Sequence, residues 1–294
     1  MKEDTAIKIL SKLEEQEREE ENLPLLLEFY RKLVQLQTSA QKRIVNPVPE
    51  LDREAIYKRL QKGLPLLSYN DLTLDWPLAQ DIFGQVSGLF ASYPQLFGES
   101  ITRLKETGDG CILTNKAVEA WFTGKELPFT ILYGASNNLM SAIIQATLQP
   151  FLASYAEALS SHVEQERWRR GYCPICGGSP DLAFLKGESG TKWLLCSRCD
   201  TEWLFQRLEC PYCGTQEQRA LAFFTDDREL YRLYVCERCK CYLKAVDLRK
   251  TESEVLLPLE RLYTMDLDKQ ARELGYHSYP KIWGEEKRIM PQAV

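Results

Sequence analysis

The sequence predicts an α+β protein in which an all-helical N-terminal domain precedes two small four-cysteine metal modules of the ribbon type and a C-terminal helix. Three observations predict this order. Apolar residues recur at three- and four-residue spacing up to about residue 170, paired cysteines and short β-type segments follow, and helical spacing returns once the cysteines stop near residue 250. The predicted domains are residues 1–170, 171–207, 208–250 and 251–294.

The bulk composition is typical of a soluble globular protein. The chain has 294 residues, 44% of them hydrophobic and 27% charged, which is enough for two or three folded units. Its net charge of -5 disfavours nucleic acid as a partner, because proteins that bind phosphates usually carry an excess of positive charge. The start, MKEDTAIKILSKLEEQEREEE, lacks the basic head and the apolar run of a secretory signal, so we expect a cytoplasmic protein.

Seven helices are expected from the spacing of apolar residues. They cover residues 10–21, 25–44, 52–60, 76–96, 114–122, 136–170 and 259–274. Pro24 precedes the second helix, and Pro47 and Pro49 end it. Thr114 is a suitable N-cap for its helix, and Pro150 predicts a kink.

One uncharged segment, residues 127–156, is long enough to cross a bilayer. Polar amides and a proline interrupt it, and such groups are costly in hydrocarbon. The interrupting residues are Asn137, Asn138, Gln145, Gln149 and Pro150. We therefore expect a buried core helix here and no membrane span.

The cysteine-rich region is expected to contain two β-hairpins. Residues 180–196 read as two strands around a glycine-rich turn, and residues 219–236 repeat this plan with Asp226–Asp227 at the turn. The final helix is expected to end at Gly275, which suits a C-terminal cap.

Eight of the ten cysteines form four CxxC pairs, and the pairs form an internal repeat. Gaps of 19, 10 and 22 residues separate successive pairs, so two long gaps flank a short one. Each half of the repeat opens with CPxCG and closes with CxRC. Two thiolates three positions apart on a tight turn converge on one ion, and a hairpin brings two such turns together into a tetrahedral cage of four sulfurs.

Other uses of paired cysteines fit less well. A disulfide framework suits an oxidising compartment, and thioredoxin-like redox motifs occur singly at the start of a helix. Two ions held by sequential pairs are therefore favoured, although a cross-braced arrangement is conceivable. The first ion would be held by Cys173, Cys176, Cys196 and Cys199, and the second by Cys210, Cys213, Cys236 and Cys239. Four thiolates suit both iron and zinc, so the ligand set leaves the ion open.

The remaining residues give little sign of catalysis. His162 and His277 lack partners at the spacing of a catalytic or metal site, and phosphate-binding loops are missing, so we expect no enzyme. Cys241 is either a substitute ligand or, more simply, a packed strand residue, and Cys111 is expected in the core. The basic cluster at residues 167–170 is interpreted as an offset to the negative charge of the cages.

The order CPICGGSP, LLCSRCDTEW, RLECPYCG and CERCKCYLK resembles the FdhE family of formate dehydrogenase accessory proteins. The resemblance covers residues 171–247 in detail, including Trp203, and extends loosely to the last helix. The chain departs from the family pattern at Cys241, where a small residue such as threonine is expected, and in its ending, PKIWGEEKRIMPQAV.

This resemblance implies a helical domain followed by two rubredoxin-like modules that hold iron, with the eight paired cysteines as ligands. It also implies a cytoplasmic, non-enzymatic role: binding the catalytic subunit of a molybdenum- or tungsten-containing formate dehydrogenase before export, in maturation or quality control. Two alternatives stay open, a rubredoxin-like electron-transfer or redox protein and a zinc-ribbon protein that binds nucleic acid. A homo-oligomer is open as well.

Overall fold

The computed structural model describes residues 1, 3–20, 22–45, 52–98, 101, 112–128 and 136–279. Its contacts divide the chain into two compact units. The first unit comprises Met1–Pro49 and Ser68–Ala158, and the second comprises Glu50–Leu67 and Leu159–Val294. This division differs from the expected boundary at residue 170, because a segment from the N-terminal region packs with the cysteine-rich part of the chain.

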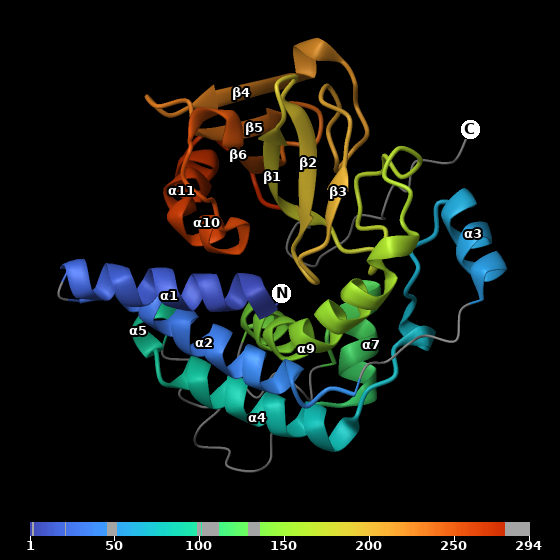
Figure 1. The fold of residues 1–294 in the computed structure, drawn as a ribbon, viewed down its shortest axis with the longest axis vertical. Coiled ribbons are helices and arrows are strands. Elements are labelled where there is room, and N and C mark those ends of the chain that lie inside the picture. The colour runs from blue at the N-terminus through green and yellow to red at the C-terminus, as the bar shows by residue number, and fades with distance from the viewer. Residues whose placement is uncertain are drawn as a thin grey trace. The chain divides into compact units, whose positions relative to one another are not determined.

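The first unit is helical, as the sequence predicts. Its helices are α1 (Glu3–Glu20), α2 (Leu25–Gln41), α4 (Trp76–Ala91), α5 (Pro94–Phe97), α7 (Asn115–Thr123) and α9 (Asn137–Leu159), with a 3₁₀ turn at Tyr69–Asp71 (Figure 1). The predicted N-cap of α7 is confirmed, because the Thr114 side chain accepts a hydrogen bond from the backbone N–H of Ala117. Phe29 of α2 packs edge-on against Phe90 of α4, with ring centroids 4.9 Å apart.

Helix α9 forms part of the core of this unit, as predicted for the uncharged segment. Met140, Ile143, Leu148 and Leu152 are fully buried along it. Within the described parts of the chain, no helix has both the length and the apolar character that a membrane crossing requires. The expectation of a buried helix is therefore confirmed for the described portion of residues 127–156.

Helix α9 ends eleven residues earlier than expected. It stops at Leu159, a 3₁₀ turn follows at Ser160–His162, and Val163 is extended. Serine and β-branched valine are poor helix formers, which explains the early end. The extension to Arg170 was therefore wrong.

The second unit is built on one six-stranded sheet. Its strands are β1 (Pro180–Lys186), β2 (Thr191–Cys196), β3 (Glu202–Leu204), β4 (Leu221–Thr225), β5 (Tyr231–Cys236) and β6 (Tyr242–Asp247). Both predicted hairpins are confirmed, because β1 pairs with β2 and β4 with β5 in antiparallel fashion. The strand order is β3-β2-β1-β6-β5-β4 (Figure 1).

The two cysteine-bearing repeats contribute three strands each to this sheet. They join through a parallel pairing of β1 with β6, in which Leu182 lies opposite Lys244 and Phe184 opposite Val246. Two parallel strands need a long connection between them, and the chain that connects β1 to β6 comprises most of both repeats. The repeats are therefore fused into a single layer.

Helices α3 (Arg53–Gln61), α10 (Leu257–Tyr263) and α11 (Met265–Glu273) complete the second unit. Leu257 of α10 packs on Leu182 and Phe184 of β1, while Ala271 of α11 packs on β5 and β6. The predicted C-terminal helix is thus divided in two at Thr264, and Gly275 follows it with a φ of 86°. The fold class is confirmed: a helical N-terminal region, a sheet with two four-cysteine clusters, and C-terminal helices.

Candidate metal centres

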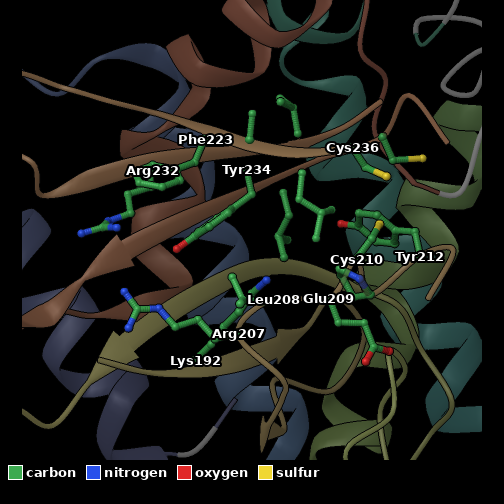
Figure 2. Close-up of a pocket in the computed structure, with 16 residues that line it drawn as sticks. Lys192, Arg207, Leu208, Glu209, Cys210, Tyr212, Phe223, Arg232, Tyr234 and Cys236 are labelled. Carbon is green, nitrogen blue, oxygen red and sulfur yellow. The ribbon is translucent and has the colours of Figure 1, made fainter. Parts of the chain in front are cut away.

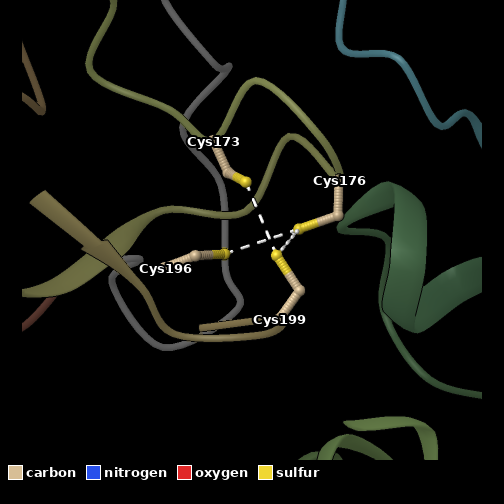
Figure 3. A group of neighbouring side chains, drawn as sticks. All are labelled: Cys173, Cys176, Cys196 and Cys199. Carbon is tan, nitrogen blue, oxygen red and sulfur yellow. Dashed lines mark hydrogen bonds between the residues drawn. The ribbon is translucent and has the colours of Figure 1, made fainter. Parts of the chain in front are cut away.

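The first cysteine cluster gathers four sulfurs from the two ends of the β1–β2 hairpin. Sγ atoms lie 3.6 Å apart for Cys173 and Cys199, 3.4 Å for Cys176 and Cys196, and 3.4 Å for Cys176 and Cys199. Figure 3 shows the four side chains converging on one point from two loops. All four residues are buried.

The second cysteine cluster repeats the arrangement at the ends of the β4–β5 hairpin. Its members are Cys210, Cys213, Cys236 and Cys239. The Sγ atoms of Cys210 and Cys239 are 3.7 Å apart, as are those of Cys213 and Cys236. Cys213 and Cys239 are partly exposed, so this cluster is more open to solvent than the first.

These distances fit a tetrahedral metal site. With metal–sulfur bonds of about 2.3 Å, the sulfurs of a tetrahedral cage lie about 3.8 Å apart. In each cluster the four sulfurs all lie within 4.8 Å of one another, and all eight thiols are free. The two groups are therefore positioned to bind one metal ion each, in the sequential order that the spacing favours.

All four cysteine turns have the same backbone conformation. In each, the N–H of the first cysteine bonds to the carbonyl five residues on, and its own carbonyl accepts from the N–H four residues on. The residue at that fourth position has a positive φ in every case: Gly177, Asp200, Gly214 and Lys240, between 55° and 68°. Glycine adopts this conformation without strain, and the CPxCG turns use it. The CxRC turns place an aspartate and a lysine there instead.

A second glycine in the first turn has a different role. A Cβ built on Gly178 would lie 2.9 Å from Cys196 Sγ, closer than such atoms approach. The first cluster therefore needs glycine at this position for space, whereas glycine at position 177 avoids the strain of a φ of 68°.

Donors from the backbone and from one side chain surround the first cluster. The N–H groups of Ile175 and Arg198 each lie 3.4 Å from a cysteine Sγ, and the Thr201 hydroxyl lies 3.0 Å from Cys199 Sγ. Such donors stabilise thiolates and tune the potential of a redox-active ion. Arg261 of α10 adds a contact, because its guanidinium donates to the carbonyl of Cys196 at 2.8 Å and pairs with Asp200 at 2.6 Å.

Burial sets the protonation of the metal-free clusters. It raises the pKa of the Cys173 thiol well above its usual value, and it raises the pKa of Cys213 to about 11. Both thiols are therefore protonated at neutral pH without an ion. A metal ion must displace these protons to bind, so acid weakens its binding.

A segment that precedes the cysteine region braces the first CxxC turn. The N–H groups of Leu66 and Leu67 donate to the carbonyls of Pro174 and Ile175 at 2.9 and 2.8 Å. Leu66 and Leu67 are both fully buried, and the Tyr172 hydroxyl bonds to the carbonyl of Gly63. Sequence reasoning missed this brace, because residues 63–67 carry no motif that points to a cysteine turn.

Cys241 lies beside the second cluster and outside its four-sulfur group. It is buried, and its Sγ is 3.4 Å from His277 Nε2. The two residues also form an isolated parallel bridge between their backbones. The simpler expectation, a packed strand residue, describes this position, and His277 acquires a partner that its spacing in the sequence does not reveal.

The other singled-out residues are less informative. Arg167 and Arg169 of the basic cluster pair with Glu164 and Glu166 at the surface. These acidic neighbours neutralise the cluster locally. Cys111 lies outside the described residues.

Comparison with known proteins confirms the resemblance seen in the cysteine motifs. Residues 172–207 match the family model described as FdhE, central domain. A protein FdhE homolog from Aquifex aeolicus is 26% identical over 255 residues, which is 85% of each chain. A protein FdhE homolog from Pseudomonas aeruginosa is 25% identical over 239 residues, covering 77% of this chain and 72% of that one.

A solved structure shares the fold. It is the crystal structure of the FdhE protein from Pseudomonas aeruginosa, which covers 94% of this chain and 92% of its own length. The TM-score is 0.62 at 23% sequence identity. The fold of this chain therefore occurs in a second protein.

Proposed function

We propose that this chain, similar to FdhE homologs along most of its length, is an accessory protein of a formate dehydrogenase. It binds the catalytic subunit of that molybdenum- or tungsten-containing enzyme in the cytoplasm, before export, and supports its assembly or quality control. The similarity to an FdhE homolog over 85% of each chain carries this proposal. The role is one of binding, with no reaction assigned to the chain.

The eight clustered cysteines serve this role as metal ligands. An ion in each cluster joins the two ends of a hairpin and fixes its two cysteine turns relative to each other. Structural sites of this kind contribute on the order of ten kcal/mol to folding. The resemblance to FdhE favours iron, and zinc would supply the same rigidity.

Isolation of the proposed partner, the catalytic subunit, tests the proposal. The tagged protein is used to isolate partners from cells that express a formate dehydrogenase with its catalytic subunit retained in the cytoplasm. We expect the catalytic subunit to be recovered with the intact protein and lost with Cys173→Ser and Cys210→Ser variants. Cys241→Ser is the matched control, since this buried cysteine lies outside both clusters. Failure of the intact protein to capture the subunit would refute the proposal.

A second candidate is electron transfer or redox chemistry at iron. The N–H and hydroxyl groups around the first cluster favour it, because donors to sulfur are a means by which proteins set the potential of an iron–thiolate site. Reversible bleaching of a visible chromophore in anaerobically purified protein would support this role. Colourless protein with stoichiometric zinc would exclude it. A homo-oligomer stays a prediction, to be checked by sedimentation.

A further inference from the structure

A pocket of about 370 Å³ lies in the second unit, beside the second cysteine cluster. Strands β2, β4, β5 and β6 and the segment 207–212 provide its walls. Figure 2 shows Arg232 and Phe223 at one end, Cys210 and Cys236 at the other, and the Tyr234 ring projecting into the space between β5 and the segment that carries Arg207. Its volume lies within the usual range for sites of small organic ligands, about 300 to 1,000 Å³.

Lys192 of β2 is a buried cation in the wall of this pocket. Lys192 is only 3% exposed, and within the described parts of the chain no carboxylate forms an ion pair with its ammonium. Its Nζ lies 4.6 Å from the ring centroid of Tyr234 and 5.6 Å from that of Phe205. A buried ammonium without a carboxylate partner is costly, and a group perturbed in this way inside a cleft is a candidate for a functional site.

Two guanidinium groups add to this positive charge. Arg232 is 8% exposed and bonds to Asp247 through one terminal nitrogen, yet its buried Nε has no hydrogen-bond partner. Arg207 donates to the carbonyl of Ser189 at 3.3 Å. The one acidic residue of the lining, Glu209, accepts a hydrogen bond from Gln216 and, with Cys210, acts on Lys192 only through its charge, which partly offsets the lowering of the Lys192 pKa by burial. The lining side chains therefore include three cations and one carboxylate, while Asp247 pairs with Arg232 from outside the lining and the cysteine cluster beside the pocket is negative when an ion is bound.

Apolar side chains line the rest of the pocket. The larger aliphatic ones are Leu208, Leu221, Val235 and Leu243. An occupant must therefore combine a negative group with an apolar body. Burial also lowers the pKa of Lys192 to about 8, and an anion opposite it would favour the charged form.

We propose that this pocket binds an organic carboxylate with an apolar body, its negative end on Lys192 and Arg207 and its apolar end toward Leu243. A free amphipathic acid and the C-terminal carboxylate of a polypeptide share this chemistry. The inference stands independently of any formate dehydrogenase client.

Calorimetric titration of the metal-loaded full-length protein tests the proposal. The probes are octanoate and N-acetyl-leucyl-phenylalanine, each compared with its neutral amide. We expect at least one acid to bind at least tenfold more tightly than its amide. A tighter fit of octanoate identifies a free acid as the natural source, and a tighter fit of the dipeptide acid identifies a polypeptide terminus.

Variants locate the binding site. Lys192→Met is expected to weaken acid binding at least tenfold, and Arg207→Gln, at an exposed position, to weaken it severalfold. Lys186→Met is the matched control, because Lys186 lies on the neighbouring strand β1 with its ammonium over Trp193 and outside the pocket. If Lys192→Met does not fold, the proposal is tested by the comparison of each acid with its amide and by the Arg207→Gln variant. Absence of acid binding, equal binding of the amides, or unchanged binding in these variants would overturn the proposal.

Discussion

The backbone N–H of Leu66 donates a hydrogen bond of 2.9 Å to the carbonyl oxygen of Pro174. Pro174 stands between the first two cysteines of the first cluster, whereas Leu66 follows α3 in the N-terminal region of the chain. The two residues belong to the same compact unit. The conformation of the first cysteine turn thus depends on a segment far away in the sequence.

Replacing Leu66 by alanine is expected to destabilise the second unit by about 2 to 5 kcal/mol, the usual loss when a buried leucine is truncated. Thermal unfolding of the metal-loaded protein measures this loss, and a chromophoric chelator measures faster release of the first ion. Leu64→Ala is the control, because Leu64 is 45% exposed and its removal leaves no cavity. Equal melting temperatures for the two variants would show that the brace is unimportant.

Gly178→Ala is expected to impair the first cluster alone. Its new methyl group would lie 2.9 Å from Cys196 Sγ, so the sulfur must move out of the tetrahedral arrangement. At the matching position of the second repeat, Thr215 already carries a side chain, so that cluster should keep its ion. The metal content, measured by elemental analysis, should therefore fall from two ions per chain toward one.

The control for this prediction is Gly88→Ala. Gly88 lies in α4, where an added Cβ meets nothing within 4 Å, and alanine is the better helix former. This variant should retain both ions and at least the original stability. Full metal content in Gly178→Ala would mean that the backbone can shift away from the sulfur at little cost.

The candidate metal centres follow closely from the sequence, because their determinants are local. A CxxC turn positions two sulfurs through backbone bonds within six residues, and a short hairpin brings two turns together. Cys173 and Cys176 could therefore be assigned to one group with Cys196 and Cys199 from spacing alone. The two hairpins and the N-cap at Thr114 follow from equally local signals.

Contacts between distant segments could not be predicted in this way. The parallel pairing of Leu182 with Lys244 joins the two repeats, and neither strand carries a feature that specifies the other. The same holds for Leu66 with Pro174 and for Cys241 with His277. Such pairings depend on how side chains pack and become buried across the whole unit. A single sequence does not show this packing.

Lys192 should make the stability of the second unit rise with pH in the alkaline range. Its pKa is lowered to about 8 in the folded protein, while an unfolded lysine keeps its proton up to about 10.4. Between these values the unfolded chain binds more protons, so the free energy of unfolding increases as the pH rises. Each pKa unit corresponds to about 1.4 kcal/mol, so the total gain is on the order of 3 kcal/mol.

Urea unfolding of the metal-loaded protein at pH 8 and pH 10 checks this rise. Lys192→Met should abolish it, because the variant lacks the titrating group. Lys186→Met, altered on the neighbouring strand, should preserve it. Parallel pH profiles for the wild type and Lys192→Met would assign the effect to other groups.

Removal of the metal ions should unfold the second unit and spare the first. Each ion contributes on the order of ten kcal/mol, which is comparable with the whole stability of a typical domain. The first unit has a separate apolar core that includes Phe29, Ile82 and Leu152, so its helices need no metal. Hydrogen exchange after chelation should therefore increase in β1–β6 and remain slow in α2, α4 and α9.

Because both repeats share one sheet, loss of one metal ion should also affect the repeat that keeps its ion. Cys213→Ser, which disables only the second cluster, should raise exchange in β6 and also in β1, because β1 pairs directly with β6. Cys241→Ser leaves both four-sulfur groups intact and should show the exchange pattern of the wild type. If β1 stayed fully protected in Cys213→Ser, the first repeat would keep its stability when the second unfolds, despite their shared sheet. Fast exchange in α9 of the chelated protein would instead mean that the helical unit depends on the metal-bearing one.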